Sequence, residues 1–269
     1  MIIDGKAIAR EILEKTKHEA SMLGSVPTFA AITVSPSPAT ESYLRIKRKQ
    51  AAEAGIDMEV IAMDTTTTEE LVERIGTLPH DALIVQLPLP AHIDLEQVLA
   101  AIPPEKDADA LSARTREEGV LMHPIARAVA EIFERAGVDP RGAQAVVIGN
   151  GWLVGQPVSV WLASVGAQVT ILTRESGDIG PSTGAADIII AGAGSPGLVK
   201  PEDVRAGATV IDVGTSELGG SLAGDVAPEV AGVAGVFTPV PGGVGPIAVA
   251  CLMRNVVELA SLQRRSKAV

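Results

Sequence analysis

The chain has 269 residues, which at roughly 150 residues per domain favours two domains, although one large α/β unit also fits. Hydrophobic residues make up 46% of the chain and charged residues 20%, so it can bury a core and is not broadly disordered. The formal net charge of −11 argues against general binding of nucleic acid or of an anionic membrane, because lysine and arginine supply most contacts to both.

The first ninety residues alternate between helical and strand patterns. A helix is expected over residues 5–23, where Ile8 and Ile12 lie one turn apart. Further helices are expected over 39–54 and 68–75, and strands over the apolar runs 28–34, 58–63 and 81–87. Strands that alternate with helices are typical of right-handed crossovers, so we expect a mainly parallel sheet.

A second cycle of strands and helices starts near residue 144. Strands are expected over 145–148, 168–172, 186–191 and 209–213, with a helix over about 154–165. This order is typical of a doubly wound, Rossmann-type nucleotide-binding domain. A last helix over about 245–262 has an apolar face with Leu252, Val256 and Leu259, and the Pro- and Gly-rich segment before it suggests a return to the first domain.

The predicted organisation is therefore α/β with two domains. The first comprises residues 1–122 plus the returning helix in 245–269, and the second comprises 138–240. Cys251 is the only cysteine, which excludes an intrachain disulfide and favours a reducing, cytoplasmic location. No run approaches the roughly 18 apolar residues of a membrane-spanning helix, and the start lacks a signal-peptide pattern, so we expect a soluble protein with no membrane partner.

Glycines mark the turn between the first strand and the first helix of the second domain. Residues 149–155 follow the pattern GxGxxxG, in which missing Cβ atoms let backbone N–H groups approach a pyrophosphate. An ordinary tight turn in an α/β domain is the alternative. The next strand ends at Thr173, Arg174 and Glu175, the position that reads the adenosine ribose. The guanidinium of Arg174 favours NADP, and the carboxylate of Glu175 leaves NAD open.

Several polar residues of the first domain are candidates for chemistry. Tyr43 and Lys47 share one helix face at i and i+4. A lysine acts as a base only if its pKa falls below the ordinary value of about 10.4, and an exposed basic face is the alternative. Gln86 lies at the end of a predicted buried strand, the place where α/β sheets bind ligands, so it is a candidate site residue. The alternative is an ordinary strand end closed by the prolines that follow. Asp107 and Asp109 flank one alanine and are either functional or ordinary loop charges.

The sequence contains no residue spacing typical of a metal site or of a nucleophile-elbow hydrolase. The four histidines, His18, His80, His92 and His123, fall in no metal-ligand spacing, so we expect them to be structural or solvent-facing and expect no metal. The sequence has no GxSxG element, which argues against hydrolase chemistry of the nucleophile-elbow kind.

Seven motifs in order resemble those of the methylenetetrahydrofolate dehydrogenase/cyclohydrolase family, and the resemblance covers nearly the whole chain. The motifs are residues 38–47, 85–90, 106–109, 149–157, 210–214, 224–226 and 238–246. The resemblance implies a folate-binding domain and a Rossmann-type domain that share one cleft. It implies oxidation of 5,10-methylenetetrahydrofolate with a nicotinamide cofactor and hydrolysis of the 5,10-methenyl cation to 10-formyltetrahydrofolate. A homodimer is implied as well.

The family's functional residues carry over to matching positions of this chain. The resemblance implies that Lys47 is catalytic, that Gln86 supports it, that Tyr43 packs against the folate and that Asp109 binds the pterin. It also implies substrate contacts from Leu87, Pro88, Pro241 and Gly242. The predicted cofactor-binding residues are Gly149, Asn150, Gly151, Leu153, Val154, Thr173, Arg174 and Thr215, and Arg174 favours NADP over NAD.

Three segments depart from the family pattern. Asp109-Ala-Leu-Ser112 stands where the family usually has Asp-Gly-Phe-His, residues 123–128 replace Pro-Cys-Thr-Pro-x-Gly, and Ile247-Ala248 replaces Met-Thr. Three alternatives stay open, two of them suggested by these departures and the second by the glycine turn at 149–155 and the two-domain outline alone. They are a dehydrogenase that has lost hydrolysis, a Rossmann dehydrogenase acting on an amino acid or hydroxy acid, and a non-catalytic nucleotide-binding module.

Overall fold

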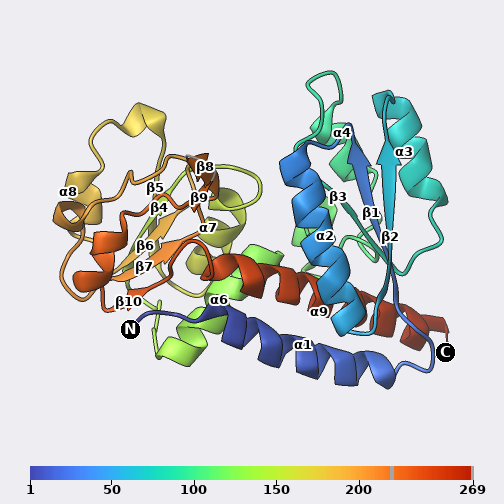
Figure 1. Ribbon diagram of the computed structural model, residues 1–269, viewed down its shortest axis with the longest axis horizontal. Helices are drawn as coiled ribbons and strands as arrows, with labels where there is room; N and C mark the ends of the chain where they lie inside the picture. Colours follow the sequence, from blue (N-terminus) through green and yellow to red (C-terminus); the bar gives the residue numbers. More distant parts are fainter. Residues whose placement is uncertain (219–220, 268–269) are drawn as a thin grey trace. The chain divides into compact units, whose positions relative to one another are not determined.

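The computed structural model describes residues 1–218 and 221–267, and the chain divides into two compact units (Figure 1). One unit, Arg10–Pro124 with the chain from Val249 onward, contains Lys47 and is called the lysine unit here. The other, Met1–Ala9 with Ile125–Ala248, contains the Gly149–Gly155 turn and is called the glycine-loop unit. The domain limits expected from the sequence stay a prediction.

The lysine unit is built on a three-stranded parallel sheet in the order β2-β1-β3 (Figure 1). β1 (Thr28–Val34) lies between β2 (Asp57–Met63) and β3 (Ala82–Val85). Residues 29–34 of β1 and all of β3 are buried. Strands covered on both faces carry continuous apolar runs instead of alternating patterns, which is what these two sequences show.

Short polar signals set where the helices of this unit begin. α2 (Pro38–Glu53) has proline in its first turn, and the Ser37 hydroxyl accepts a hydrogen bond from Thr40 N. α3 (Thr68–Thr77) begins with a capping box formed by Thr67 and Glu70. The remaining helices are α4 (Leu95–Ala100), α5 (Ala113–Glu118) and the part of α1 (Gly5–Ser21) that follows Ala9.

The glycine-loop unit contains a five-stranded parallel sheet in the order β10-β7-β6-β4-β5. The strands are β4 (Gln144–Ile148), β5 (Gln168–Leu172), β6 (Ile188–Ala191), β7 (Thr209–Asp212) and β10 (Val236–Phe237). From β4 the chain adds β5 on one side and later β6 on the other. Such a reversal creates a crevice beyond the carboxyl ends of the strands, where α/β proteins bind ligands. The doubly wound second half is therefore confirmed.

Helices and a small hairpin complete this unit. They are α6 (Pro124–Ala136), α7 (Gly155–Ser164), α8 (Gly180–Thr183), the 3-10 turns Arg174–Ser176, Pro201–Asp203 and Pro228–Gly232, and the hairpin β8 (Ser216–Leu218) with β9 (Ser221–Ala223). The first residues of the chain join β10, since Ile3 N donates to Phe237 O at 2.9 Å.

The last helix, α9 (Val244–Lys267), starts in the glycine-loop unit and belongs from Val249 to the lysine unit, as expected for a returning helix. Its predicted apolar residues Leu252, Val256 and Leu259 are buried. By length and composition alone, α9 is long and apolar enough to span a membrane, although the sequence predicts no membrane-spanning run. Most of its apolar stretch is buried within the protein, as in the core helix of a soluble fold.

Candidate functional site

Lys47 and Gln86, 39 residues apart in sequence, meet in the lysine unit. Lys47 Nζ on α2 donates a hydrogen bond to Gln86 Oε1 at 2.9 Å. Gln86 directly follows β3, and its backbone N donates to Ile32 O of β1 at 2.7 Å, which fixes its position. Its Nε2 donates to Leu87 O at 2.9 Å, so the amide oxygen faces the lysine. The predicted pairing of a lysine with a supporting glutamine is present in this geometry.

Two opposite charges share this site. Burial lowers the pKa of Lys47, and the negative charge of Asp109 opposes that shift. Burial raises the pKa of Asp109 to about 6, against the opposing effect of Lys47. Each shift favours the neutral form of its group, so both the amine and the carboxyl group can change protonation nearer to neutral pH than exposed side chains do.

The carboxylate of Asp109 is available to accept hydrogen bonds. Among the described residues, no hydrogen bond ends on its oxygen atoms, and the residue is only partly buried. Tyr43, one helical turn before Lys47, is 37% exposed, so its ring is accessible. Leu87 is partly buried and Pro88 is exposed, and they are joined by a cis peptide bond directly after Gln86.

Asp107 anchors the loop that carries Asp109. Its buried carboxylate accepts hydrogen bonds from Ser112 N at 2.9 Å and from Thr115 Oγ1 at 2.8 Å. Ala110 has a φ of 50°, a left-handed conformation that favours glycine and that costs a side chain about 1–2 kcal/mol. The loop therefore carries backbone strain at this residue.

His123 is buried, at 6% exposed, which agrees with the structural alternative of the two predicted for it. It is also electrostatically coupled to Lys47, which the sequence alone does not indicate. Burial, followed by the charges of Arg116 and Lys47, lowers the pKa of His123 to about 3, so the imidazole is neutral at ordinary pH. The departure of residues 123–128 from the family pattern was the one available signal.

The glycines of the 149–155 turn permit close backbone packing. Gly149 has a φ of 100°, and a Cβ atom on it would lie 2.5 Å from Gly192 O. A Cβ atom on Gly155 would lie 2.1 Å from Gly149 O. A Cβ atom on Gly151, in contrast, would meet nothing within 4 Å, so the backbone there is open to a ligand.

The first turn of α7 leaves one backbone donor beside those glycines among the described residues, the N–H of Gly155, because Gln156 N donates to Gly151 O at 3.1 Å and Pro157 has no N–H. Its N-cap residue is Val154, and no side chain in the described part of the protein caps the helix. Free N–H groups at a helix N-terminus favour an anion such as a pyrophosphate. Asn150 and Leu153, also predicted to contact the cofactor, are exposed in the same turn. The glycine pattern, the uncapped helix and the open backbone together fit a dinucleotide.

The end of β5 presents one cation. Thr173 accepts a hydrogen bond from Glu175 N and begins a short 3-10 turn. Arg174 is exposed and forms no ion pair with any residue in the ranges described. Its guanidinium can therefore bind a phosphate group without breaking an existing contact.

Two buried carboxylates support the loops around this crevice. Asp225 accepts hydrogen bonds from three successive backbone N–H groups, those of residues 193–195, at 2.6–2.9 Å. Asp212 accepts from the N–H groups of Gly214, Asp225 and Val226. Burial raises the pKa of Asp212 to about 6 despite these bonds. Both aspartates lie in motifs of the sequence, 210–214 and 224–226, but the pattern alone predicts no role for either.

Three further predicted residues lie in the glycine-loop unit. Thr215 is exposed and follows Gly214 directly, so the Asp212 network fixes the backbone before it. Pro241 is exposed and follows a cis peptide bond, and Gly242 O accepts a hydrogen bond from Gly5 N at 2.9 Å.

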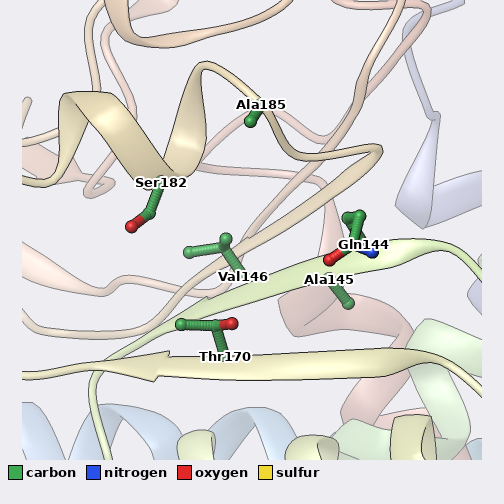
Figure 2. A pocket seen from close by; sticks show the side chains of 6 residues that line it. All are labelled: Gln144, Ala145, Val146, Thr170, Ser182 and Ala185. Carbon is green, nitrogen blue, oxygen red and sulfur yellow. The ribbon is translucent and has the colours of Figure 1, made fainter.

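A small cavity of about 230 Å³ lies elsewhere in the same unit (Figure 2). It is lined by Gln144, Ala145, Val146, Thr170, Ser182 and Ala185, from β4, β5, α8 and the residues after α8. None of these is a candidate site residue, and they precede the carboxyl ends of the strands. Among the described residues, no group of three or more His, Cys, Asp or Glu side chains is placed to hold a metal ion.

Comparisons with known proteins cover both units. The model of the tetrahydrofolate dehydrogenase/cyclohydrolase catalytic domain matches residues 3–109, and that of the NAD(P)-binding domain matches residues 124–264. A bifunctional protein FolD from Halothermothrix orenii is 40% identical over 275 residues, covering 96% of each chain. One from Moorella thermoacetica is 40% identical over 274 residues, covering 96% of this chain and 98% of its own.

Solved structures show the same similarity. The bifunctional enzyme FolD, a methylenetetrahydrofolate dehydrogenase/cyclohydrolase from Campylobacter jejuni, superposes with a TM-score of 0.94 at 33% identity, covering 98% of this chain and 99% of its own. The Trypanosoma brucei enzyme, solved with NADP cofactor and an inhibitor, has a TM-score of 0.92 at 35% identity and covers 98% of each chain.

Proposed function

Since the chain belongs to the tetrahydrofolate dehydrogenase/cyclohydrolase family, we infer that it oxidises 5,10-methylenetetrahydrofolate with NADP and hydrolyses the 5,10-methenyl product to 10-formyltetrahydrofolate. The observation that carries this inference is the hydrogen bond from Lys47 to Gln86, which holds an amine of lowered pKa at the carboxyl end of the buried strand β3. A module that only binds nucleotides has no use for such an amine. No observation favours an amino acid or hydroxy acid as the substrate.

Asp109 binds the pterin part of the folate in this proposal. The pterin amide and amino groups are donors, and an ionised carboxylate accepts from them with charge-assisted hydrogen bonds. The support is that no described residue already donates to this carboxylate. Tyr43 contributes an accessible ring for packing, and Leu87, Pro88, Pro241 and Gly242 contribute further substrate contacts.

Lys47 moves the protons of the hydrolysis. Water adds to the electrophilic methenyl carbon, and the neutral amine accepts a proton from that water. The resulting ammonium group returns a proton to N5 as the bond from carbon to N5 breaks, which leaves the formyl group on N10. One proton is released overall. Gln86 holds Nζ in place through both states because its amide oxygen accepts from an amine and from an ammonium group.

NADP, when bound, accepts the hydride that leaves the methylene carbon. The backbone of Gly149, Asn150 and Gly151 and the first turn of α7, with Leu153 and Val154 beside it, would hold the pyrophosphate. Thr173 and Arg174 would hold the adenosine ribose and its 2′-phosphate, and Thr215 would add a contact. The open backbone at Gly151 and the lack of an ion pair at Arg174 among the described residues support these assignments.

Two assays of the purified protein test the function. We expect methenyl formation from 5,10-methylenetetrahydrofolate with NADP and, separately, hydrolysis of supplied methenyl substrate. Failure of both reactions would overturn the proposed function. If the protein oxidises the methylene substrate but does not hydrolyse the methenyl substrate, it is a dehydrogenase without cyclohydrolase activity.

The choice of cofactor has its own test. Replacement of Arg174 by alanine should raise the KM for NADP about 5- to 10-fold and leave the KM for NAD within about twofold, because only NADP carries the phosphate that the guanidinium binds. Equal changes for both cofactors would contradict the role of Arg174. Glu175→Ala, on the next residue, is the matched control and should not weaken NADP binding.

We also propose that the protein works in the cytoplasm as a homodimer, without nucleic acid or membrane partners. The single cysteine and the charge of −11 support the location and the lack of anionic partners. The resemblance to the family supports the dimer. Sedimentation velocity at micromolar concentration should give twice the chain mass of 27.7 kDa. A species at the chain mass would contradict the dimer, and recovery with membranes after cell fractionation would contradict the location.

A further inference from the structure

Asn255 joins two backbone segments next to candidate site residues. It lies on α9, has an exposed fraction of 0%, and belongs to the lysine unit. Its Nδ2 donates to Ala108 O at 2.8 Å and to Met122 O at 3.0 Å. A side-chain amide nitrogen has two hydrogens, so both are used in these bonds. The residues that follow the two carbonyls are Asp109 and His123.

The peptide that precedes Asp109 is held on two sides. Ala108 N donates to Leu83 O of β3 at 3.2 Å, while Ala108 O accepts from Asn255. The strand therefore fixes one edge of this residue, and α9 fixes the other. Because the backbone dihedrals at Ala108 set the direction of the next Cα–Cβ bond, they also set where the Asp109 carboxylate points.

The second segment brings another polar group to the same lysine. His123 is buried, and both His123 and Asp109 are electrostatically coupled to Lys47. A single amide thus fixes the backbone before both groups. Residues 108 and 122 are 14 positions apart, and the hydrogen bonds to Asn255 join them through one side chain.

We propose that Asn255 is a positioning residue of the folate site, which holds the Asp109 loop and the His123 segment in register with each other. This rests on the proposed function, because that function assigns Asp109 to the pterin. Asn255 does not touch the reacting atoms. Its loss frees two carbonyls and lets the two segments shift, and a misplacement of about 1 Å can cost roughly 100-fold in rate.

Gln263 provides a matched control on the same helix. Its Nε2 also donates to two backbone carbonyls, Asp81 O and Glu105 O, both at 2.6 Å. Neither carbonyl precedes a candidate site residue. Gln263→Ala therefore removes the same number and kind of hydrogen bonds from α9 without loosening the site, which separates lost stability from lost positioning.

The experiment compares full-length wild type with Asn255→Ala, Asn255→Ser and Gln263→Ala. Melting temperature, kcat and KM for 5,10-methylenetetrahydrofolate and for NADP, and the rate of methenyl hydrolysis are measured. We expect Asn255→Ala to raise the KM for the folate at least tenfold and to slow hydrolysis, with the KM for NADP within twofold. Asn255→Ser keeps one hydrogen-bond donor, so its KM for the folate should lie between those of the wild type and Asn255→Ala. Gln263→Ala should keep the wild-type KM for both the folate and NADP.

Several results would overturn the proposal. One is a wild-type KM for the folate in Asn255→Ala or, if that variant does not fold, in Asn255→Ser. Another is an equal rise of both KM values, or the same kinetic change in Gln263→Ala. Inactive wild-type protein would instead overturn the proposed function and this role with it. Active wild type with unaffected Asn255 variants would overturn only the positioning role.

Discussion

Each unit holds carboxylates, but the two units stabilise them differently: Asp212 and Asp225 are buried, whereas Asp109 is partly buried. In the glycine-loop unit, Asp212 and Asp225 each accept three backbone N–H groups. In the lysine unit, Asp109 has the opposite charge of Lys47 nearby and no hydrogen bond from a described residue. A carboxylate whose oxygen atoms already accept backbone N–H groups holds loops together. A carboxylate that has only an opposite charge nearby can still accept hydrogen bonds from a ligand.

The largest effect should come from the charge that balances Asp109. Lys47→Ala should lower methenyl hydrolysis by about 10²–10⁴-fold, because the proton carrier is lost. Methylene oxidation should fall less, since it needs no proton transfer from this amine. Lys49→Ala, on the same helix with a 79% exposed side chain, is the control and should keep both rates. Equal loss of both activities in Lys47→Ala would indicate a general defect of binding or folding.

Removal of a backbone-saturated carboxylate should act on stability. Asp225→Ala leaves the N–H groups of residues 193–195 without their acceptor, which should cost about 3 kcal/mol or more in the free energy of unfolding. Denaturant titration measures this cost. The KM for NADP should also rise, because these residues follow β6 at the crevice. Wild-type stability would show that solvent replaces the carboxylate without penalty.

Removal of the ligand-facing carboxylate should instead act on binding and on its pH dependence. Asp109→Asn should raise the KM for the folate by about 10- to 100-fold, since charge-assisted hydrogen bonds contribute about 1.5–3 kcal/mol. In the wild type, kcat/KM for the folate should rise as pH increases through about 6, where Asp109 ionises. This step should vanish in the variant. A step that persists near pH 6 would belong to another group.

The same carboxyl group has a defined effect on stability. Folded protein retains the Asp109 proton up to about pH 6, whereas the unfolded chain releases it near 3.8. The folded state therefore binds more protons in this window, and the contribution of Asp109 to the free energy of unfolding decreases as pH rises through it. Comparing wild type with Asp109→Asn at pH 4 and pH 7 isolates that contribution.

The smallest effect concerns the strained residue beside Asp109. Ala110→Gly should stabilise the protein by about 0.5–1 kcal/mol, because glycine adopts a φ of 50° without steric cost. Thermal melting measures the gain. Ala91→Gly, in an exposed turn of the same unit, serves as a control for the added flexibility of the unfolded chain. A loss of stability at Ala110 equal to that of the control would show that the strain is negligible.

Much of the fold could be predicted because its determinants are local. The buried strands β1, β3 and β6 are mostly apolar runs, and the capping pair Thr67 and Glu70 predicts the start of α3. The observed elements of the first ninety residues lie within two residues of the expected limits. The end of α9 was placed five residues too early, because Arg264, Arg265 and Lys267 look like the end of an apolar pattern although the helix continues through them.

The candidate site was only partly predictable. Lys47 and Gln86 stand in recognisable motifs, and the structure joins them. Asn255, His123 and Asp225 act through hydrogen bonds or charges to residues far away in sequence, and such contacts leave no local pattern. The role of Asn255 is visible only when α9 lies against the carbonyls of residues 108 and 122.

The anchoring of the 107–115 loop by Asp107 has a consequence for affinity. Ser112 N and Thr115 Oγ1 hold this carboxylate before any substrate arrives. A loop that is already fixed loses little conformational entropy when the folate binds, so more of the free energy of each contact contributes to the binding affinity. Asp109 is in this sense preorganised, and the free energy of folding, not that of binding, contains the cost of ordering it.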